Sequence, residues 1–227
     1  MVEGIQRWRI AFRRGAPALE LGPPEIARAW EAALAEAGVP VVLSAAAKPR
    51  PRLTFAAGLP PGRIAGHDLL DVVLAERWPL ARLRSALSEA LPAGLEIVDL
   101  YDVWLGAPSV SAALIATTHR VTVGGGTTDE LATAASTLLA STVLERTRAK
   151  GAERQTTYDL RPLILALKVG PDAPIVRMLL RTSSDGLSGR PDEVILALGE
   201  VVGRELELVE LIRERLWTND EAPTLEK

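Results

Sequence analysis

Residues 23–45, PPEIARAWEAALAEAGVPVVLSA, predict a helix that is followed directly by a strand. The two prolines suit the first turn of a helix, where backbone amides have no partner within the helix. Apolar residues then recur every three or four positions, as on the buried face of an amphipathic helix. Gly38 is a typical stop signal. The run from Val39 to Ala45 is mostly apolar, and we expect it to form a strand.

The sequence on either side continues this alternation of strands and helices. Residues 6–12 alternate in polarity like a half-buried strand. Residues 48–52 interrupt the strand expected from Val39, residues 53–57 resume its extended structure, and residues 69–74 and 95–103 are further predicted strands. A second helix begins at Pro79 and ends at Gly94. The resulting order, β-α-β-β-α-β, is typical of a ferredoxin-like unit with an antiparallel sheet and both helices on one face.

The second half of the chain repeats this order. Thr127 and Glu130 are spaced as a capping box at the start of a helix, and Arg190-Pro191 opens another. Around these helices, residues 120–123, 175–182 and 205–212 are expected to form strands, and residues 142–147 and 158–169 are expected to be extended between the first helix and the strand at 175–182. We therefore predict an α+β protein of two tandem ferredoxin-like units, residues 1–104 and 118–216, with a disordered acidic tail at 217–227. Each unit would leave the sheet face opposite its helices free for a partner.

The amino-acid composition excludes several classes of function. At 48% hydrophobic and 24% charged residues, the 227-residue chain is typical of a globular protein. The absence of cysteine excludes disulfides, thiolate metal sites, cysteine nucleophiles and an iron–sulfur cluster of its own. No apolar run reaches about 20 residues and no signal peptide precedes the first strand, so we expect a cytoplasmic protein without membrane contact. His67 and His119 are the only histidines and lack metal-site spacing. We predict no metal, no cofactor and no catalytic residue.

Positive charge is concentrated at the start of the chain. The net charge of −3 disfavours a general nucleic-acid binder, yet residues 1–63 hold nine Lys or Arg against five Asp or Glu. The most distinctive cluster is Lys48-Pro49-Arg50-Pro51-Arg52, whose prolines stiffen the backbone between the cations. Arg7 and Arg9 lie on the strand expected nearby. Lys48, Arg50, Arg52, Arg7 and Arg9 are therefore candidates for binding RNA or another anion. The alternative is that they only solubilise an exposed loop and strand.

Two further motifs, Asp159-Leu160-Arg161-Pro162 and Arg190-Pro191-Asp192-Glu193, combine arginine, proline and a carboxylate. Asp159, Arg161, Arg190 and Glu193 could contact a partner. The structural alternative, which we favour, is that Arg161 pairs with an acid such as Asp192 and that Glu193 stabilises its helix N-terminus through the helix dipole.

Taken in order, several stretches resemble the radical SAM-linked protein family, a domain of unknown function found beside, or fused to, radical SAM proteins. The matching positions extend over nearly the whole chain and comprise 26–31, 37–41, Ser44, Pro49, Pro51, 53–56, 59–60, 71–72, 107–109, 159–162 and 190–193. Two departures stand out. Residues 22–25, Gly-Pro-Pro-Glu, replace the family's usual Ser-His-Leu-Asp, and residues 46–49, Ala-Ala-Lys-Pro, replace its Gly-Phe-Asn-Pro.

The resemblance implies an accessory role beside a radical SAM enzyme. Our leading hypothesis is a non-catalytic module that binds a radical SAM protein and presents RNA or another anionic substrate through residues 48–52. A second is an RNA-processing or RNA-modifying enzyme, because the tandem layout is similar to that of the CRISPR repeat-processing endoribonucleases; His67 and Lys48 would be its acid–base candidates. A third is a structural protein that dimerises through a sheet face.

Overall fold

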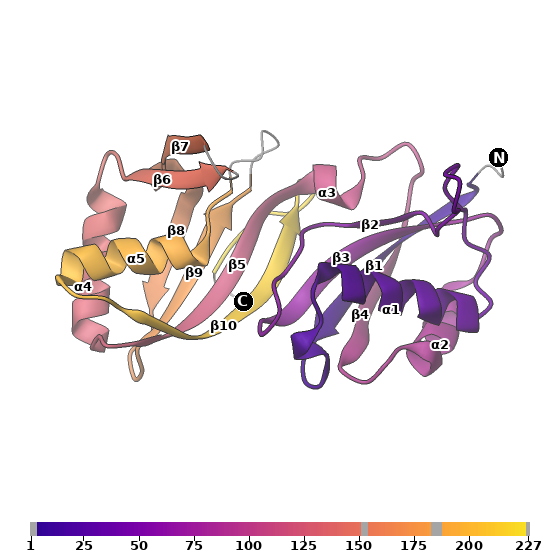
Figure 1. Ribbon diagram of the computed structural model, residues 1–227, viewed down its shortest axis with the longest axis horizontal. Helices are drawn as coiled ribbons and strands as arrows, with labels where there is room; N and C mark the ends of the chain where they lie inside the picture. The colour runs from indigo at the N-terminus through magenta and orange to yellow at the C-terminus, as the bar shows by residue number, and fades with distance from the viewer. Residues whose placement is uncertain (1–3, 151–153, 183–187, 226–227) are drawn as a thin grey trace. The chain divides into compact units, whose positions relative to one another are not determined.

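The computed structural model describes residues 4–150, 154–182 and 188–225. These residues form an α+β fold in two compact units, Met1–Leu114 and Ile115–Lys227 (Figure 1). Among the described residues, no helix combines the length and the hydrophobicity that a membrane-spanning segment requires.

The described part of the first unit contains an antiparallel sheet in the order β4-β1-β3-β2. Its elements are β1 (Gln6–Arg14), the 3₁₀ turn η1 (Ala18–Glu20), α1 (Pro23–Glu36), β2 (Leu53–Phe55), β3 (Ile64–Leu74), α2 (Leu80–Ala90), β4 (Leu95–Val103) and α3 (Val110–Ala113). This strand order and pairing are those of a β-α-β-β-α-β unit, as the sequence predicts.

Both long helices of the first unit pack on the same face of its sheet. Ile10 and Phe12 point from β1 into a buried cluster that includes Trp30 of α1 and Leu83 of α2. The Phe12 and Trp30 rings meet edge to face with their centroids 5.2 Å apart, a favoured aromatic geometry. Gly38 follows α1 with a φ of +63°, a left-handed conformation that favours glycine and explains why the helix ends there.

The predicted strand at residues 39–45 is present only as isolated bridges. Val41 pairs with Leu74 and Leu43 with Pro51, without a continuous ladder. Pro40 has no backbone amide to donate, so it interrupts the pairing. Residues 44–50 form a loop instead, closed by a hydrogen bond of 2.8 Å from the Ser44 amide to the Arg50 carbonyl.

The sheet face opposite these helices is partly covered, which corrects our expectation that it is free. The chain crosses this face after β4. A guanidinium nitrogen of Arg7 donates to the carbonyl of Trp104 at 2.6 Å, and Asp71 of β3 accepts from the Val110 amide at 2.8 Å. The segment 104–113 is thereby fastened to β1 and β3.

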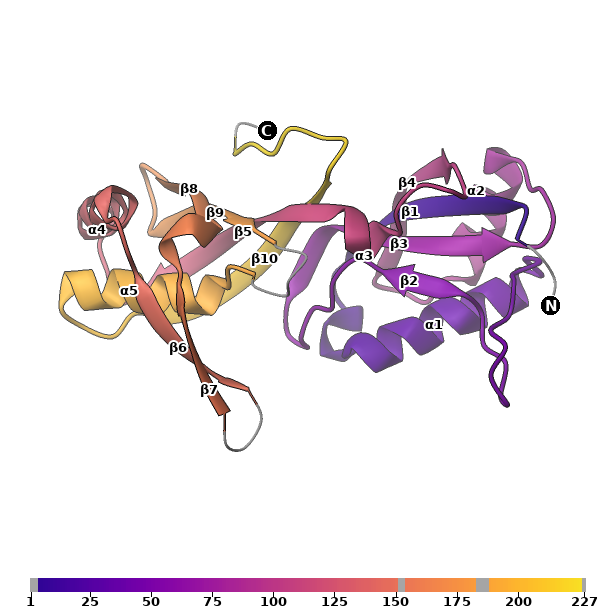
Figure 2. The ribbon, with the colours of Figure 1, turned by 90° about the horizontal axis from the view of Figure 1, so that it is seen from above.

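The second unit repeats the strand order and adds a hairpin. In its described part the sheet order is β10-β5-β9-β8, while β6 and β7 pair with each other and project from the unit (Figure 2). The elements are β5 (Leu114–Gly124), α4 (Thr128–Ala140), β6 (Glu145–Lys150), β7 (Arg154–Asp159), η2 (Arg161–Leu163), β8 (Ile164–Val169), β9 (Ile175–Arg181), α5 (Pro191–Val202) and β10 (Glu207–Thr218). Thr127 and Glu130 form the predicted capping box of α4.

Two segments of the second unit differ from their predictions. The residues predicted as extended from 158 to 169 divide between the hairpin, where Tyr158 pairs with Arg146, and β8. The predicted disordered tail also has structure in its described part. Trp217 belongs to β10, and Leu225 packs with it and with Leu179 in a small buried cluster.

Candidate anion-binding cavity

A cavity of about 490 Å³ opens beside β2 in the first unit. Three of the predicted anion-binding residues, Arg7, Arg50 and Arg52, line it. The fold brings them together because β1 supplies the first and the loop before β2 supplies the other two. The remaining lining includes the carboxylates of Glu31 and Asp71, the hydroxyls of Ser44, Thr54 and Ser109, and the apolar Leu53 and Phe55.

Both carboxylates of the cavity already have partners. Asp71 accepts from Arg9 Nε at 2.8 Å, in addition to its bond from the Val110 amide. Glu31 of α1 accepts from Arg50 at 2.9 and 3.3 Å. An incoming anion therefore meets acids whose charge is compensated, and the charge balance of the lining is positive.

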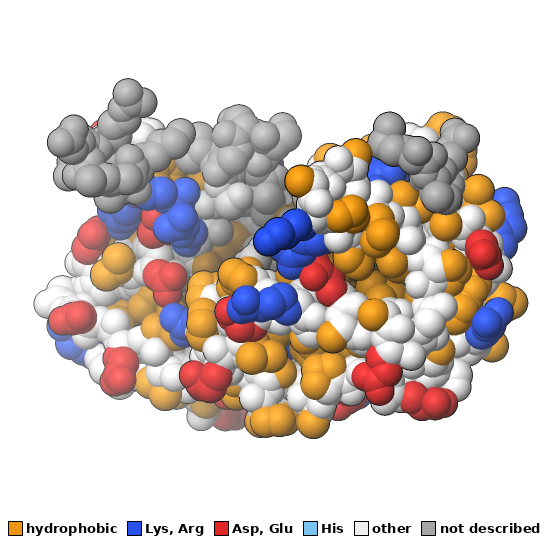
Figure 3. Space-filling model, turned by 45° about the vertical axis from the view of Figure 1, so that its right-hand side comes forward, with side chains coloured by type: hydrophobic (Ala, Val, Ile, Leu, Met, Phe, Trp, Pro, Cys, Tyr) orange, Lys and Arg blue, Asp and Glu red, His pale blue; other side chains and the backbone are white. Residues whose placement is uncertain are grey.

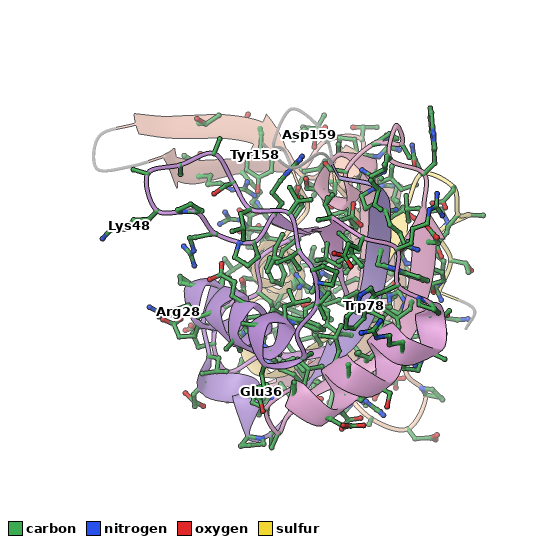
Figure 4. The ribbon with its side chains drawn as sticks, turned by 90° about the vertical axis from the view of Figure 1, so that its right-hand side faces the viewer. Arg28, Glu36, Lys48, Trp78, Tyr158 and Asp159 are labelled. Atoms are coloured by element: carbon green, nitrogen blue, oxygen red, sulfur yellow. The ribbon has the colours of Figure 1, made fainter. Side chains whose placement is uncertain are left out.

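Two cations beside the cavity are uncommitted. The side chains of Lys48 and Arg52 are exposed and form no hydrogen bond or ion pair with any residue that the structure describes. Lys48 points outward from its loop (Figure 4). The Arg52 amide donates to the Val42 carbonyl at 2.8 Å, which fixes the backbone from which its side chain extends.

Positive side chains are dispersed on the face of the molecule that Figure 3 shows. On the face of the molecule in Figure 3, Lys and Arg side chains lie beside Asp, Glu and apolar side chains and do not form one large positive field. A broad electrostatic surface for duplex nucleic acid would need such a field. The geometry suits a compact anionic group better.

Arg7 and Arg9 differ from the exposed strand cations that the sequence suggests. Arg9 is buried, and it binds Asp71 and the Pro108 carbonyl, the latter at 3.3 Å. Arg7 is only 8% exposed and donates to the carbonyls of Trp104 and Ala107. Arg7 reaches the cavity lining, whereas the charge of Arg9 is compensated by its buried partner.

Sequence reasoning missed Asp71 and Ser109 as cavity residues. Asp71 interrupts the apolar run of β3, and an acid in a buried strand signals that it has a partner. Ser109 lies in the stretch that we interpreted as an interdomain boundary. Its place at the cavity follows from contacts such as Arg7 to Ala107, which joins residues 100 positions apart and has no local sequence signal.

The Asp159 motif is structural in this fold. Asp159 accepts from the Leu144 and Arg161 amides at 2.8 and 2.9 Å. Arg161 donates to the carbonyls of Leu139 and Ile164 rather than to an acid, which corrects the pairing suggested from the sequence. These bonds close the base of the hairpin against the end of α4.

Glu193, in the first turn of α5, binds the hairpin as well as facing the helix N-terminus. Its carboxylate accepts from Arg148 at 3.1 Å and from the Tyr158 hydroxyl. Burial, together with the hydrogen bond to Glu193, raises the pKa of Tyr158, so its hydroxyl stays protonated and donates. Arg190 precedes the helix with an exposed side chain that forms no cap.

Residues 7–189 match a family described as an uncharacterized protein conserved in bacteria, DUF2344. This match covers well over half of the chain. The chain belongs to this family. Every residue of the cavity lies inside the region that defines the DUF2344 match, whereas Arg190 and Glu193 lie beyond it.

The fold of this DUF2344 protein is similar to that of a chain in a solved structure. A chain in the crystal structure of a Cbf5-Nop10-Gar1 complex is similar, with a TM-score of 0.53 and 11% identity, over 92% of this chain and 48% of that one. The DUF2344 chain thus spans about half of that chain, and the likeness concerns the fold alone. No curated protein matches the chain.

The family description gives no activity and no partner, so the radical SAM partner inferred from the resemblance stays a prediction. Within the described ranges, no group of three or more His, Cys, Asp or Glu side chains is placed to hold a metal ion.

Proposed function

We propose that this DUF2344 protein is a non-catalytic binding module that holds an anionic substrate, RNA in the first instance, in the cavity beside β2. The observation that carries the proposal is an unpaired cation, Arg52, in the lining of a cavity whose two carboxylates are already paired, with a second unpaired cation, Lys48, in the loop that supplies Arg50 and Arg52. A phosphate would gain charge-assisted hydrogen bonds there without displacing an internal ion pair.

The loop is suited to this task because it is stiffened on both sides of Arg50. Pro49 and Pro51 restrict the backbone, and the Arg50 amide donates to Ser44 Oγ at 3.1 Å. The cations therefore lose little backbone freedom on meeting a phosphate chain. Phe55 and Leu53 supply apolar surface in the same cavity, which suits the sugar or base of a nucleotide.

We further propose that the substrate is held for a radical SAM enzyme. This rests on the resemblance described above and on the lack of cysteine, since the cluster of such an enzyme would have to come from the partner. Co-purification of the two proteins expressed together tests it. Failure to form a complex, at concentrations where each is folded, argues against this partner without affecting the cavity.

The cavity is tested by titrating a dye-labelled single-stranded 12-mer RNA and following anisotropy at several salt concentrations. Arg52→Gln should weaken binding about fivefold, equivalent to about 1 kcal/mol for one lost contact. It should also reduce the slope of log K against log salt by about 0.7, the contribution of one phosphate contact to a single strand. Lys48→Gln should act in the same direction.

Arg13→Gln is the control, because it removes one positive charge from the same unit at a site that does not line the cavity. Arg13 is exposed, with 62% of its side chain accessible, and it pairs with Glu96. If Arg13→Gln lowers affinity and salt slope as much as Arg52→Gln, the binding is a general charge effect and the proposed site is wrong.

A further inference from the structure

The outer strand of the first unit presents an edge without a neighbour. In the described part of the chain, β4 pairs with β1 along one side only. The register shift between Ala11 and Phe12 makes the strand irregular near Val98, but from Asp99 to Val103 the pairing with β1 is continuous. These five residues include neither lysine nor proline, which natural edge strands often use to block further pairing.

Apolar side chains gather where this strand ends. Trp104 is 78% exposed, and Tyr101 and Leu105 are 41% and 43% exposed. A tryptophan this accessible is uncommon on a folded surface, and tryptophan and tyrosine are the residues that most often anchor protein interfaces. The three residues together with Asp99–Val103 are called here the β4 edge.

Trp104 is held in place although it is exposed. Its carbonyl accepts from Arg7 at 2.6 Å and from the Ala107 amide at 3.0 Å, which closes a tight turn. A Cβ added at Gly106 would lie 2.5 Å from the indole, so the ring packs directly over this glycine. The indole is therefore already ordered before a partner binds, so binding costs little conformational entropy at this side chain.

The charge beside Trp104 selects the kind of partner. Asp102 is exposed and accepts from the neutral Gln6 side chain at 2.9 Å, and it has no cationic partner among the described residues. A phosphate chain would be repelled by this carboxylate. A lysine or arginine would be attracted both by the carboxylate and by the face of the indole.

We infer that the β4 edge is a docking site for an extended, cationic segment of another protein, which adds as a strand beside Asp99–Val103. Main-chain hydrogen bonds would provide affinity, and alternate side chains would reach Asp102 and Trp104. The inference is independent of the cavity, because none of the residues of the β4 edge lines it.

The test uses a dye-labelled ten-residue peptide of alternating valine and lysine, titrated with the full-length protein. We expect saturable binding that falls at least tenfold in Trp104→Ala and about threefold in Asp102→Asn. Arg52→Gln should leave peptide binding unchanged, just as Trp104→Ala should leave RNA binding unchanged. Thermal unfolding of each variant verifies its fold, and an exposed tryptophan is a mild site to replace.

Two further peptides separate strand addition from simple charge attraction. A version with proline at the central valine cannot complete a ladder, and a valine–glutamate version reverses the charge; both should bind at least tenfold more weakly. Equal binding of all three peptides, or of wild type and Trp104→Ala, overturns the inference. Two other results would also overturn it. If the protein dimerises and Trp104→Ala abolishes the dimer, the edge binds a second copy of the chain; if Trp104→Ala loses RNA binding, the edge binds nucleic acid.

Discussion

Replacing Asp71 with asparagine removes the negative charge that holds the crossing segment 104–113 on the first unit. Asp71 is 2% exposed and accepts from Arg9 at 2.8 and 3.2 Å and from the Val110 amide at 2.8 Å. Asparagine keeps an acceptor for Val110 but leaves the Arg9 guanidinium buried without a counter-charge. Breaking a buried pair in this way destabilises a protein by about 3–5 kcal/mol, which is a large share of a typical stability of about 5–15 kcal/mol.

Urea unfolding followed by circular dichroism measures this loss. The double variant Arg9→Met/Asp71→Asn should recover part of it, because it removes the orphaned charge as well. Asp99→Asn is the control, since the Asp99–Arg84 pair is 48% and 37% exposed and should contribute less than about 1 kcal/mol. A loss below 1 kcal/mol in Asp71→Asn, or no recovery in the double variant, refutes the view that a buried charge pair fastens the segment.

Two further predictions concern the second unit. Burial, with a smaller effect from the Arg213 charge, lowers the pKa of His119 to about 3 from 6.5. As the pH falls, His119 is therefore protonated in the unfolded chain before it is protonated in the folded one. The free energy of unfolding should decrease by up to about 1.4 kcal/mol for each pH unit as the pH is lowered from 6.5 to 3. Thermal unfolding from pH 7 to 4 should show this fall and a shallower one in His119→Gln, and identical profiles would contradict it. Leu225→Ala should destabilise the protein by about 2 kcal/mol because Leu225 packs on Leu179 and Trp217. An unchanged midpoint in urea would mean that the tail contributes nothing.

The sequence predicts well those features of the fold that depend on local patterns. The helix at Pro23 to Glu36, its stop at Gly38 and the capping box at Thr127 each rest on residues a few positions apart. The prediction of a continuous strand at residues 39–45 was wrong, because it followed the apolar composition of this segment and neglected the missing backbone amide of Pro40. The extended segments expected at 142–147 and 158–169 overlap the start of β6 and the end of β7, but their pairing as a hairpin was missed, because the residues between are polar and lack the alternation that marks a half-buried strand.

The candidate site was predictable only in part, for a related reason. The loop cations at 48–52 stand out because their spacing with proline is local. The acids that compensate Arg9 and Arg50 lie 62 and 19 positions from them, so the sequence alone does not show which cations are already neutralised. That distinction, between paired and uncommitted charge, is what directs the proposal to Lys48 and Arg52.

Arg7 shows how the two proposed surfaces can be separated although they share a support. Its guanidinium lines the cavity and also fixes the turn that presents Trp104. Arg7→Lys would keep a positive charge but lose the planar fork that donates to two carbonyls, so the turn should loosen while the charge of the cavity persists. Peptide binding at the β4 edge should then fall more than RNA binding. Equal losses would mean that Arg7 supports the first unit as a whole and fixes neither surface in particular.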